Sequence, residues 1–310
     1  MTRPTIGLAL GSGSARGWAH IGVIEALAEA GIRPDVVCGS SIGALIGAAH
    51  VTDELETLKD WVRTIGWQEI VQLMDFKPMA GGLIQGQRLM KFFHDRHQDA
   101  AIETLATPFA AVATDLISGR EVWFREGSLM DAVRASIALP GLFSPVNVEG
   151  RWLVDGGLVN PVPVSVCRAL GAEFIIAVNL NGDLVGRHFS DQGALEAEPE
   201  KLTPPTGMLE KLIAELPAGV KNGARGLVPE FFGMNADAPG YFDVLAGSIN
   251  IMQDLITRSR MAGDPPDVLL TPRLAQIGLL EFNRADEAIE EGRNCVRRML
   301  PSIKGLTSLT

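Results

Sequence analysis

The sequence predicts an α/β protein with a mainly parallel central sheet. Two short runs, TIGLAL (5–10) and PDVVCG (34–39), are apolar at nearly every position, as in strands that are covered on both faces. Each is followed by small residues and then by an apolar segment with helical periodicity, from Trp18 to about Ala30 and at 41–51. A strand, helix, strand, helix order of this kind is typical of a parallel α/β layer.

The remaining elements follow the same logic. Residues 53–98 have a mostly helical pattern that the glycines of MAGGLIQG (79–86) interrupt. The rest of the chain is expected to form a strand, turn and strand at 109–124, a helix at 128–140, two extended pieces at 146–157, a helix at 163–170, a strand at 172–180, a helix at 242–261, a strand at 266–272 and a helix at 284–299.

Residues 181 to about 240 differ from the rest because they are polar and rich in glycine and proline. This stretch is too long for a simple connection, so we expect one domain over residues 1–310 with a flexible or lid-like insertion at about 181–240. Within it, MLEKLIAEL (208–216) has its apolar residues on one helical face. That face is expected either to act as a lid or to pack on the core as a structural cover.

Composition excludes several classes of protein. The formal net charge of −10 argues against nonspecific nucleic-acid binding, which needs a basic surface. Three widely spaced cysteines indicate neither a disulfide framework nor a zinc site. No signal peptide and no long uninterrupted apolar run is evident, so the expectation is a soluble cytoplasmic protein, and its acidic charge still allows peripheral contact with the inner membrane surface through a local apolar patch. The oligomeric state is not specified.

A candidate nucleophile lies between the second strand and its helix. The pentapeptide Gly39-Ser40-Ser41-Ile42-Gly43 matches G-x-S-x-G, with Ser41 in the nucleophile position. Gly39 and Gly43 allow strand and helix to come close at the sharp turn, and the amides at the start of the helix face any oxyanion that forms there. The alternative is an ordinary turn in which Ser41 caps the helix.

The loop after the first strand, Gly11-Ser12-Gly13-Ser14-Ala15-Arg16-Gly17, is a candidate anion site. A dinucleotide-binding loop is disfavoured, because Arg16 occupies the third glycine position and the second strand ends without an acidic residue. Exposed amides beside Ser41 would instead form an oxyanion hole. The alternative is a tight turn that packs helix on strand. Arg16 either locks the loop by hydrogen bonds or meets an anionic headgroup.

The base that would activate Ser41 is not an obvious histidine. His50 falls at the far end of the helix after Ser41, His94 and His97 lie in a charged helical stretch, and His188 lies in the insertion. A triad with histidine is therefore disfavoured. Asp155 ends the extended segment WLVD and precedes two glycines, which makes it either a turn residue or an acid placed at a strand end.

Taken together, these segments resemble the bacterial patatin-like phospholipase family, in particular its RssA-type members. The stretches that carry the resemblance are IGLALGSGSARGWAHIGVIEAL, GSSIGALIGAA, FAAVATDLISGREVWF, RASIALPGLFSPV, WLVDGGLVNPVPV and RMAGDPPD. The resemblance implies a three-layer α/β/α fold, a Ser41–Asp155 dyad without histidine, and no metal or cofactor. It also implies an oxyanion hole at Ser12, Gly13 and Ser14, where many members have three glycines, with Arg16 and Gly17 as support.

Three functions follow from these expectations. The leading one is a serine acyl-ester hydrolase, in which Ser41 attacks the ester of a lipid and a desolvated Asp155 takes its proton. The alternative is a regulatory or interaction protein that keeps the fold with little turnover. The third, a nucleotide-binding enzyme, predicts binding of NAD or NADP, which we do not expect.

Overall fold

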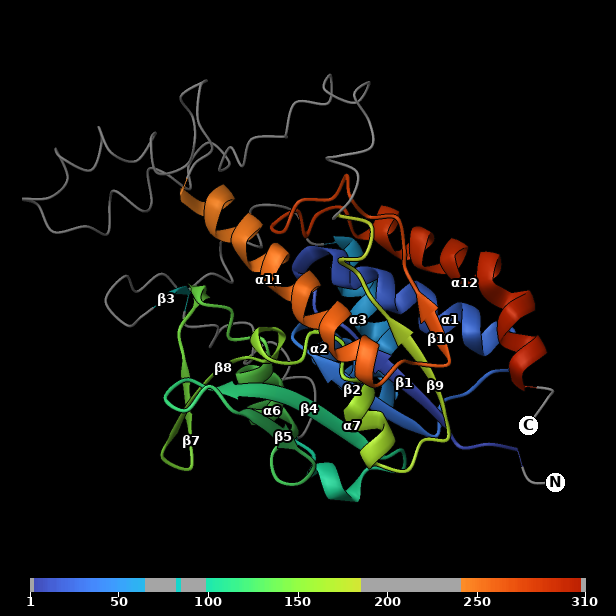
Figure 1. Ribbon diagram of the computed structural model, residues 1–310, viewed down its shortest axis with the longest axis horizontal. Helices are drawn as coiled ribbons and strands as arrows, with labels where there is room; N and C mark the ends of the chain where they lie inside the picture. Colours follow the sequence, from blue (N-terminus) through green and yellow to red (C-terminus); the bar gives the residue numbers. More distant parts are fainter. Residues whose placement is uncertain (1–2, 65–81, 85–98, 185–240, 308–310) are drawn as a thin grey trace, which may run out of the picture.

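The computed structural model describes residues 3–64, 82–84, 99–184 and 241–307 (Figure 1). Its strands are β1 (Ile6–Leu10), β2 (Val36–Ser40), β3 (Gly82–Ile84), β4 (Phe109–Asp115), β5 (Glu121–Phe124), β6 (Gly141–Phe143), β7 (Val146–Val148), β8 (Arg151–Asp155), β9 (Phe174–Val178) and β10 (Val268–Leu270). Its α-helices are α1 (Ala19–Glu29), α2 (Ile42–Val51), α3 (Leu55–Thr64), α6 (Leu129–Ser136), α7 (Val164–Ala169), α11 (Tyr241–Gly263) and α12 (Ala285–Thr307). Three 3-10 turns are η1 (Ser14–Trp18), η2 (Ile102–Thr104) and η3 (Gly156–Leu158).

The central sheet is mixed but mainly parallel. Its strand order is β10-β9-β1-β2-β4-β8-β7, and β5 pairs with β4 beside this path. The five strands from β10 to β4 are mutually parallel, whereas β5 and β8 both run antiparallel to β4. The predicted parallel α/β fold is confirmed.

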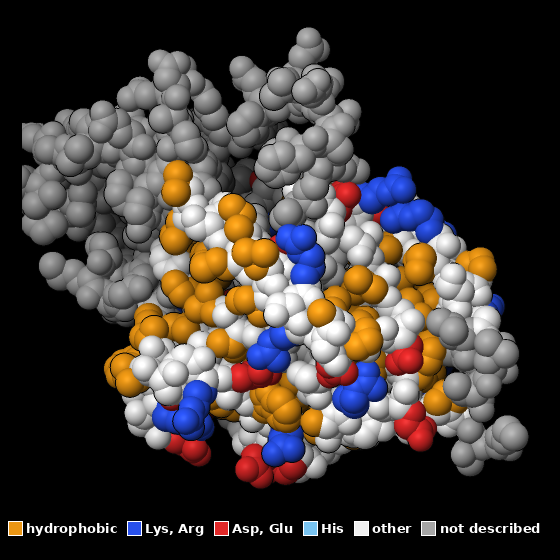
Figure 2. Space-filling view, viewed as in Figure 1, with side chains coloured by type: hydrophobic (Ala, Val, Ile, Leu, Met, Phe, Trp, Pro, Cys, Tyr) orange, Lys and Arg blue, Asp and Glu red, His pale blue; other side chains and the backbone are white. Residues whose placement is uncertain are grey.

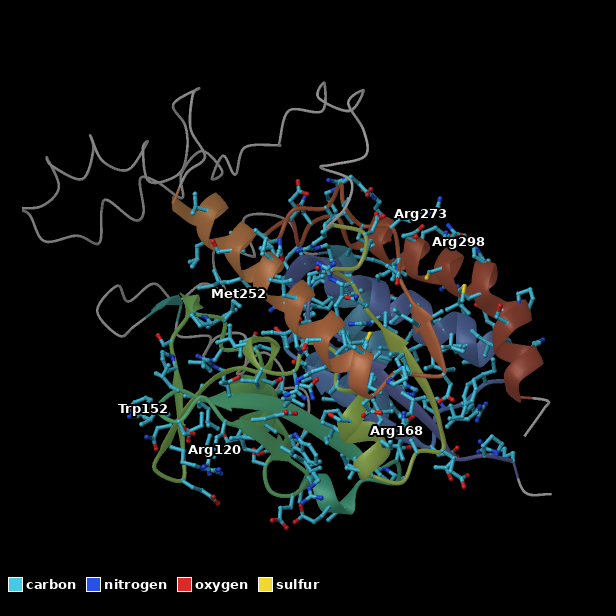
Figure 3. All side chains as sticks on the ribbon, viewed as in Figure 1. Arg120, Trp152, Arg168, Met252, Arg273 and Arg298 are labelled. Atoms are coloured by element: carbon cyan, nitrogen blue, oxygen red, sulfur yellow. The ribbon has the colours of Figure 1, made fainter. Side chains whose placement is uncertain are left out.

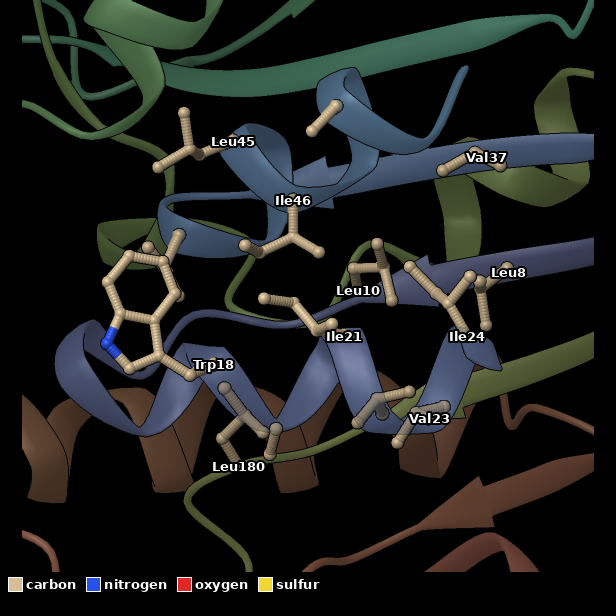
Figure 4. Close-up of a cluster of buried hydrophobic side chains, with 14 of the residues drawn as sticks. Leu8, Leu10, Trp18, Ile21, Val23, Ile24, Val37, Leu45, Ile46 and Leu180 are labelled. Atoms are coloured by element: carbon tan, nitrogen blue, oxygen red, sulfur yellow. The ribbon is translucent and has the colours of Figure 1, made fainter. Parts of the chain in front are cut away.

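Alternation along the strands divides the core into two layers. Leu8 and Leu10 of β1 face one side, where they meet α1 and α2 in a cluster that also takes in residues of α3, α6 and α12 (Figure 4). Ala9, between them, faces the other side, where the cluster includes Val166 and Cys167 of α7. Because side chains alternate in a strand, a run that is apolar at every position can fill both layers. The result is the expected three-layer arrangement.

The predicted elements are found with differences at their ends. The helix expected at 128–140 ends at Ser136, and the short strand β6 follows it and pairs with β3 around Gly141, which has a φ of 82°. The first helix begins as the 3-10 turn η1. The last helix does not stop at 299 but continues through Pro301 to Thr307, where the fully buried Ile303 anchors it to the core.

Two sequence predictions lie largely outside the described residues. Of the 53–98 stretch, the structure describes α3, β3 and the connection before α3. Of the insertion expected at about 181–240, it describes 181–184, which form a turn after β9. The lid prediction, with its helix at 208–216, therefore stays untested.

Candidate active site

The site lies where two strands meet end to end. Strand β2 pairs with β4 as far as Ser40, which stands opposite Val112, and β8 pairs with β4 from Asp155, which stands opposite Ala113. Strand β5 also pairs with both of these β4 residues, so it must occupy the opposite edge of β4. Strands β2 and β8 therefore share one edge of β4. The last residues of the two strands are thus brought head to head beside adjacent positions of β4.

Ser41 occupies the sharp turn that leaves this edge. Its backbone has a φ of 57° and a ψ of −127°, a conformation that residues other than glycine rarely adopt. The turn is tight because Gly39 and Gly43 allow close packing: a Cβ at Gly43 would lie 2.2 Å from the carbonyl oxygen of Leu10. Ser40 is fully buried, whereas Ser41 keeps 9% of its surface exposed. Of the two serines, Ser41 is therefore the one that faces the site.

The Ser41 hydroxyl donates a hydrogen bond to Asp155. The distance from Ser41 Oγ to Asp155 Oδ2 is 2.5 Å. His50 lies nine residues along α2, or about 13 Å from Ser41 at the rise of an α-helix. Among the described residues, Asp155 is thus the group in position to accept the proton of Ser41. His94, His97 and His188 lie outside the described residues.

Asp155 is held on all sides and is fully buried. Its Oδ1 accepts from the Gly157 amide at 2.7 Å, its carbonyl oxygen accepts from Thr114 Oγ1 at 2.7 Å, and its amide donates to the Ala138 carbonyl at 3.0 Å. Burial raises the pKa of Asp155 from 3.8 to about 7, against the hydrogen bonds from Ser41 and Gly157, which lower this pKa. A carboxylate with this pKa is a competent base near neutral pH.

Two amides of the glycine-rich loop have no hydrogen-bond acceptor among the described residues. The amide of Gly11 donates to Val178, that of Ser12 to Pro161, that of Ala15 to Leu279 and that of Arg16 to Gly13. No acceptor within the described part of the chain takes the amides of Gly13 and Ser14. Among the residues predicted to form an oxyanion hole, Ser12, Gly13 and Ser14, the first already donates its amide to Pro161. The oxyanion hole itself stays a prediction. Ser14 also has a positive φ of 52°.

The residues predicted to support this loop lie beneath it. Arg16 is 1% exposed, its Nη2 donates to Asn250 Oδ1 on α11 at 3.1 Å, and burial lowers its pKa to about 10. Arg16 thus links the loop to α11, as the locking alternative expects. Gly17 gives α2 room, since a Cβ there would lie 2.2 Å from the side chain of Ile42.

Two supporting residues were missed in the sequence. Ser136, at the end of α6, accepts from the Ser41 amide at 2.9 Å and donates to the Val112 carbonyl at 2.6 Å, so it fixes the strained turn to β4. His20 Nε2 lies 2.8 Å from the carbonyl oxygen of Gly11, and burial lowers its pKa to about 4. A neutral His20 therefore donates to Gly11 and braces the loop from α1. The segment RASIALPG contained Ser136, but nothing in its pattern gave that serine a partner.

Comparison with known proteins shows the family to which this chain belongs. The sequence model of the family described as patatin-like phospholipase matches residues 8–168, just over half of the chain. The matched region contains the glycine-rich loop, Ser41 and Asp155. The chain belongs to the patatin-like phospholipase family.

Individual proteins are similar to this patatin-like chain over different lengths. An uncharacterized NTE family protein of Mycobacterium tuberculosis is 33% identical, with 97% of this chain and 92% of the relative covered. The neuropathy target esterase sws of Drosophila melanogaster is 37% identical over 58% of this chain, but over only 13% of its own length. Among solved structures, VipD from Legionella pneumophila covers 97% of this chain and 67% of its own, at a TM-score of 0.47 and 13% identity.

Two further features of this patatin-like chain concern metals and membranes. Within the described ranges, no three His, Cys, Asp or Glu side chains come together as a set that could hold a metal ion. The helices in those ranges include none with the length and apolarity needed to span a bilayer.

Proposed function

We propose that this protein is a serine acyl-ester hydrolase of the patatin type, acting on lipid esters through a Ser41–Asp155 dyad. The observation that carries the proposal is the 2.5 Å contact between Ser41 Oγ and a buried carboxylate whose pKa lies at about 7. A carboxylate at its usual pKa would be too weak a base, and a serine without a base would be too weak a nucleophile.

In the proposed reaction, Asp155 Oδ2 takes the hydroxyl proton as Ser41 Oγ attacks the ester carbonyl carbon. The tetrahedral intermediate collapses with cleavage of the carbon–oxygen bond, and Asp155 passes its proton to the leaving alcohol. The product at this stage is an acyl group on Ser41. Water then attacks the acyl-enzyme, Asp155 takes a proton from that water, and the fatty acid is released as Ser41 regains its proton.

The negative charge of the intermediate would be stabilised from two sides. The amides of Gly13 and Ser14 lack acceptors among the described residues and stand in the loop that precedes α1. The N-terminus of α2 begins at Ile42, directly after the nucleophile, so its dipole favours an oxyanion there. A single donor of this kind is typically worth about 10²- to 10³-fold in turnover.

A lipid substrate is supported by a row of exposed apolar side chains on α11. Val244, Ile251, Met252 and Leu255 share the outer face of this helix and are each about half exposed. Figure 2 shows hydrophobic side chains gathered along the helix, and Met252 is labelled in Figure 3. We therefore propose peripheral contact with a lipid surface through this face. The assignment to RssA-type members stays a prediction.

The proposal is tested with a panel of phospholipid, lysophospholipid, triacylglycerol and p-nitrophenyl butyrate. The wild type is expected to release fatty acid from at least one lipid and to cleave the soluble ester, whereas Ser41→Ala and Asp155→Asn are expected to lose at least about 10³-fold in turnover. A folded wild type that hydrolyses none of these esters would contradict the proposal and favour the regulatory alternative.

A further inference from the structure

Helix α11 has a buried face, and one glutamine on that face reaches the site. Ile249, Gln253 and Thr257 follow one another at intervals of four residues, and each is at most 5% exposed. The helix contacts η3, the turn that directly follows Asp155. A glutamine buried to this degree needs hydrogen-bond partners, and the partners of Gln253 lie in the site.

Gln253 joins the glycine-rich loop to the turn that follows β9. Its Oε1 accepts from Ser12 Oγ at 3.0 Å and from Asn181 Nδ2 at 2.8 Å. Asn181 is itself fixed, because its backbone N–H donates to Asn179 Oδ1 at 3.1 Å. The side chain of Ser12 is thus held from α11, while its backbone amide is held by Pro161 at 2.8 Å.

Gly157 marks the point at which these groups converge. A Cβ built there would lie 2.5 Å from Gln253 Nε2, 2.9 Å from Asp155 Oδ1 and 3.1 Å from Ser12 Cβ. Loop, base and α11 therefore pack around a single glycine. A displacement of Gln253 would shift the loop relative to Asp155.

We infer that Gln253 is a positioning residue of the hydrolytic site, which sets the place of the Gly13 and Ser14 amides relative to Ser41 and Asp155 by holding Ser12. This inference rests on the proposed function. The position of these two amides matters for the transition state, because they stabilise the negative charge that develops there and interact less with the neutral ester of the bound substrate. Loss of Gln253 is expected to lower kcat and to leave KM nearly unchanged.

The test compares p-nitrophenyl butyrate hydrolysis by the wild type, Gln253→Met, Ser12→Ala and the double variant. Methionine keeps the length of glutamine but accepts no strong hydrogen bond. Gln253→Met is expected to lower kcat about 10- to 100-fold with KM within about threefold. Ser12→Ala should lower kcat less, and the double variant should be no slower than Gln253→Met, because both changes break the same link.

Thr257→Val is the matched control, since it alters a buried polar residue one turn further along the same face of α11. Wild-type kcat in a folded Gln253→Met, fully multiplicative losses in the double variant, or an equal loss in Thr257→Val would overturn the inference. If Gln253→Met does not fold, an unchanged kcat in Ser12→Ala overturns it. A wild type without esterase activity contradicts the proposed function instead, and the inference falls with it.

Discussion

At the scale of single residues, the proposed reaction depends on the ionisation of Asp155. The carboxylate is the active form, and its pKa of about 7 means that this form is lost as the pH falls through 7. We predict that kcat/KM for a soluble ester decreases about tenfold per pH unit below this point. A pH-rate profile measures where this acidic decrease in kcat/KM begins. A decrease that begins only near pH 4, the ordinary range of an aspartate, would contradict the proposed environment of Asp155.

The same shift predicts an effect on stability. Because the pKa of Asp155 is about 7 in the folded protein and 3.8 in the unfolded chain, the folded state binds this proton more tightly. The resulting stabilisation is fully present below pH 3.8 and is lost as the pH rises to about 7. Asp155→Asn removes the free-energy cost of ionising a buried carboxyl. Above pH 7 its free energy of unfolding should therefore exceed that of the wild type by up to about 4 kcal/mol. The advantage should shrink toward pH 4. Denaturant unfolding at pH 5 and 8 measures it, and a pH-independent difference would count against the shift.

Ser136 gives a third prediction at this scale. Ser136→Ala leaves the buried amide of Ser41 and the Val112 carbonyl without this partner. The expected loss is about 1–3 kcal/mol in the free energy of unfolding, together with at least a tenfold fall in kcat, because the strained turn loses its support.

Ser128→Ala is the matched control for Ser136. Ser128 caps the other end of the same helix by accepting from the Asp131 amide at 3.0 Å. Loss of this cap is expected to lower the free energy of unfolding by about 0.5–2 kcal/mol, while kcat stays near the wild-type value. Equal kcat in the two variants would show that Ser136 acts on stability alone.

At the scale of elements, the central feature is the meeting of β2 and β8 on one edge of β4. Gly156 makes this meeting possible, since a Cβ there would lie 2.1 Å from the Val112 carbonyl oxygen and 2.8 Å from Ser40 Oγ. Gly156→Ala is expected to push the end of β8 away from β2, to destabilise the fold by about 1–3 kcal/mol and to abolish most turnover.

Gly247→Ala is the control for this substitution. Gly247 lies within α11, and apart from the backbone of its own helix a Cβ there would meet no atom of the described residues within 4 Å. Alanine should therefore stabilise the helix by about 0.5–1 kcal/mol and leave turnover unchanged. Steady-state kinetics and thermal unfolding of both variants measure these effects. A Gly156→Ala enzyme with normal turnover would contradict the head-to-head arrangement of β2 and β8 as the basis of the site.

Much of this arrangement could be predicted from local sequence. Fully apolar runs indicated β1, β2 and β9, and Gly39 and Gly43 indicated the sharp turn at Ser41. The pairing of β8 antiparallel to β4 could not be predicted, because the register depends on contacts between distant segments. Ser136 and Gln253 were missed for a related reason: serines and glutamines are common in helices, and only the folded chain shows that theirs are buried against the site.

At the scale of the whole molecule, the outer face of α11 bears on how the protein meets its substrate. Replacing Ile251 and Leu255 by serine removes two exposed apolar side chains from this face. Hydrolysis of lipid in vesicles is expected to fall about 5- to 10-fold, with no change for p-nitrophenyl butyrate, because only the vesicle assay depends on burial of this face.

Ile117→Ser is the control for α11, since Ile117 is 83% exposed at the turn between β4 and β5. It is expected to leave both activities unchanged. Equal losses on vesicles and on the soluble ester in the α11 variant would assign Ile251 and Leu255 to the stability of the helix rather than to a lipid contact.

The most direct test of the central claim is covalent labelling by a fluorophosphonate, which reacts with activated serines. The wild type is expected to gain one adduct, and peptide mass spectrometry should place it on Ser41. Ser40→Ala should still be labelled if it folds, whereas Ser41→Ala should not, and Asp155→Asn should react at least about 100-fold more slowly. An adduct on another serine, or undiminished labelling of Ser41→Ala, would contradict the assignment of Ser41 as the nucleophile.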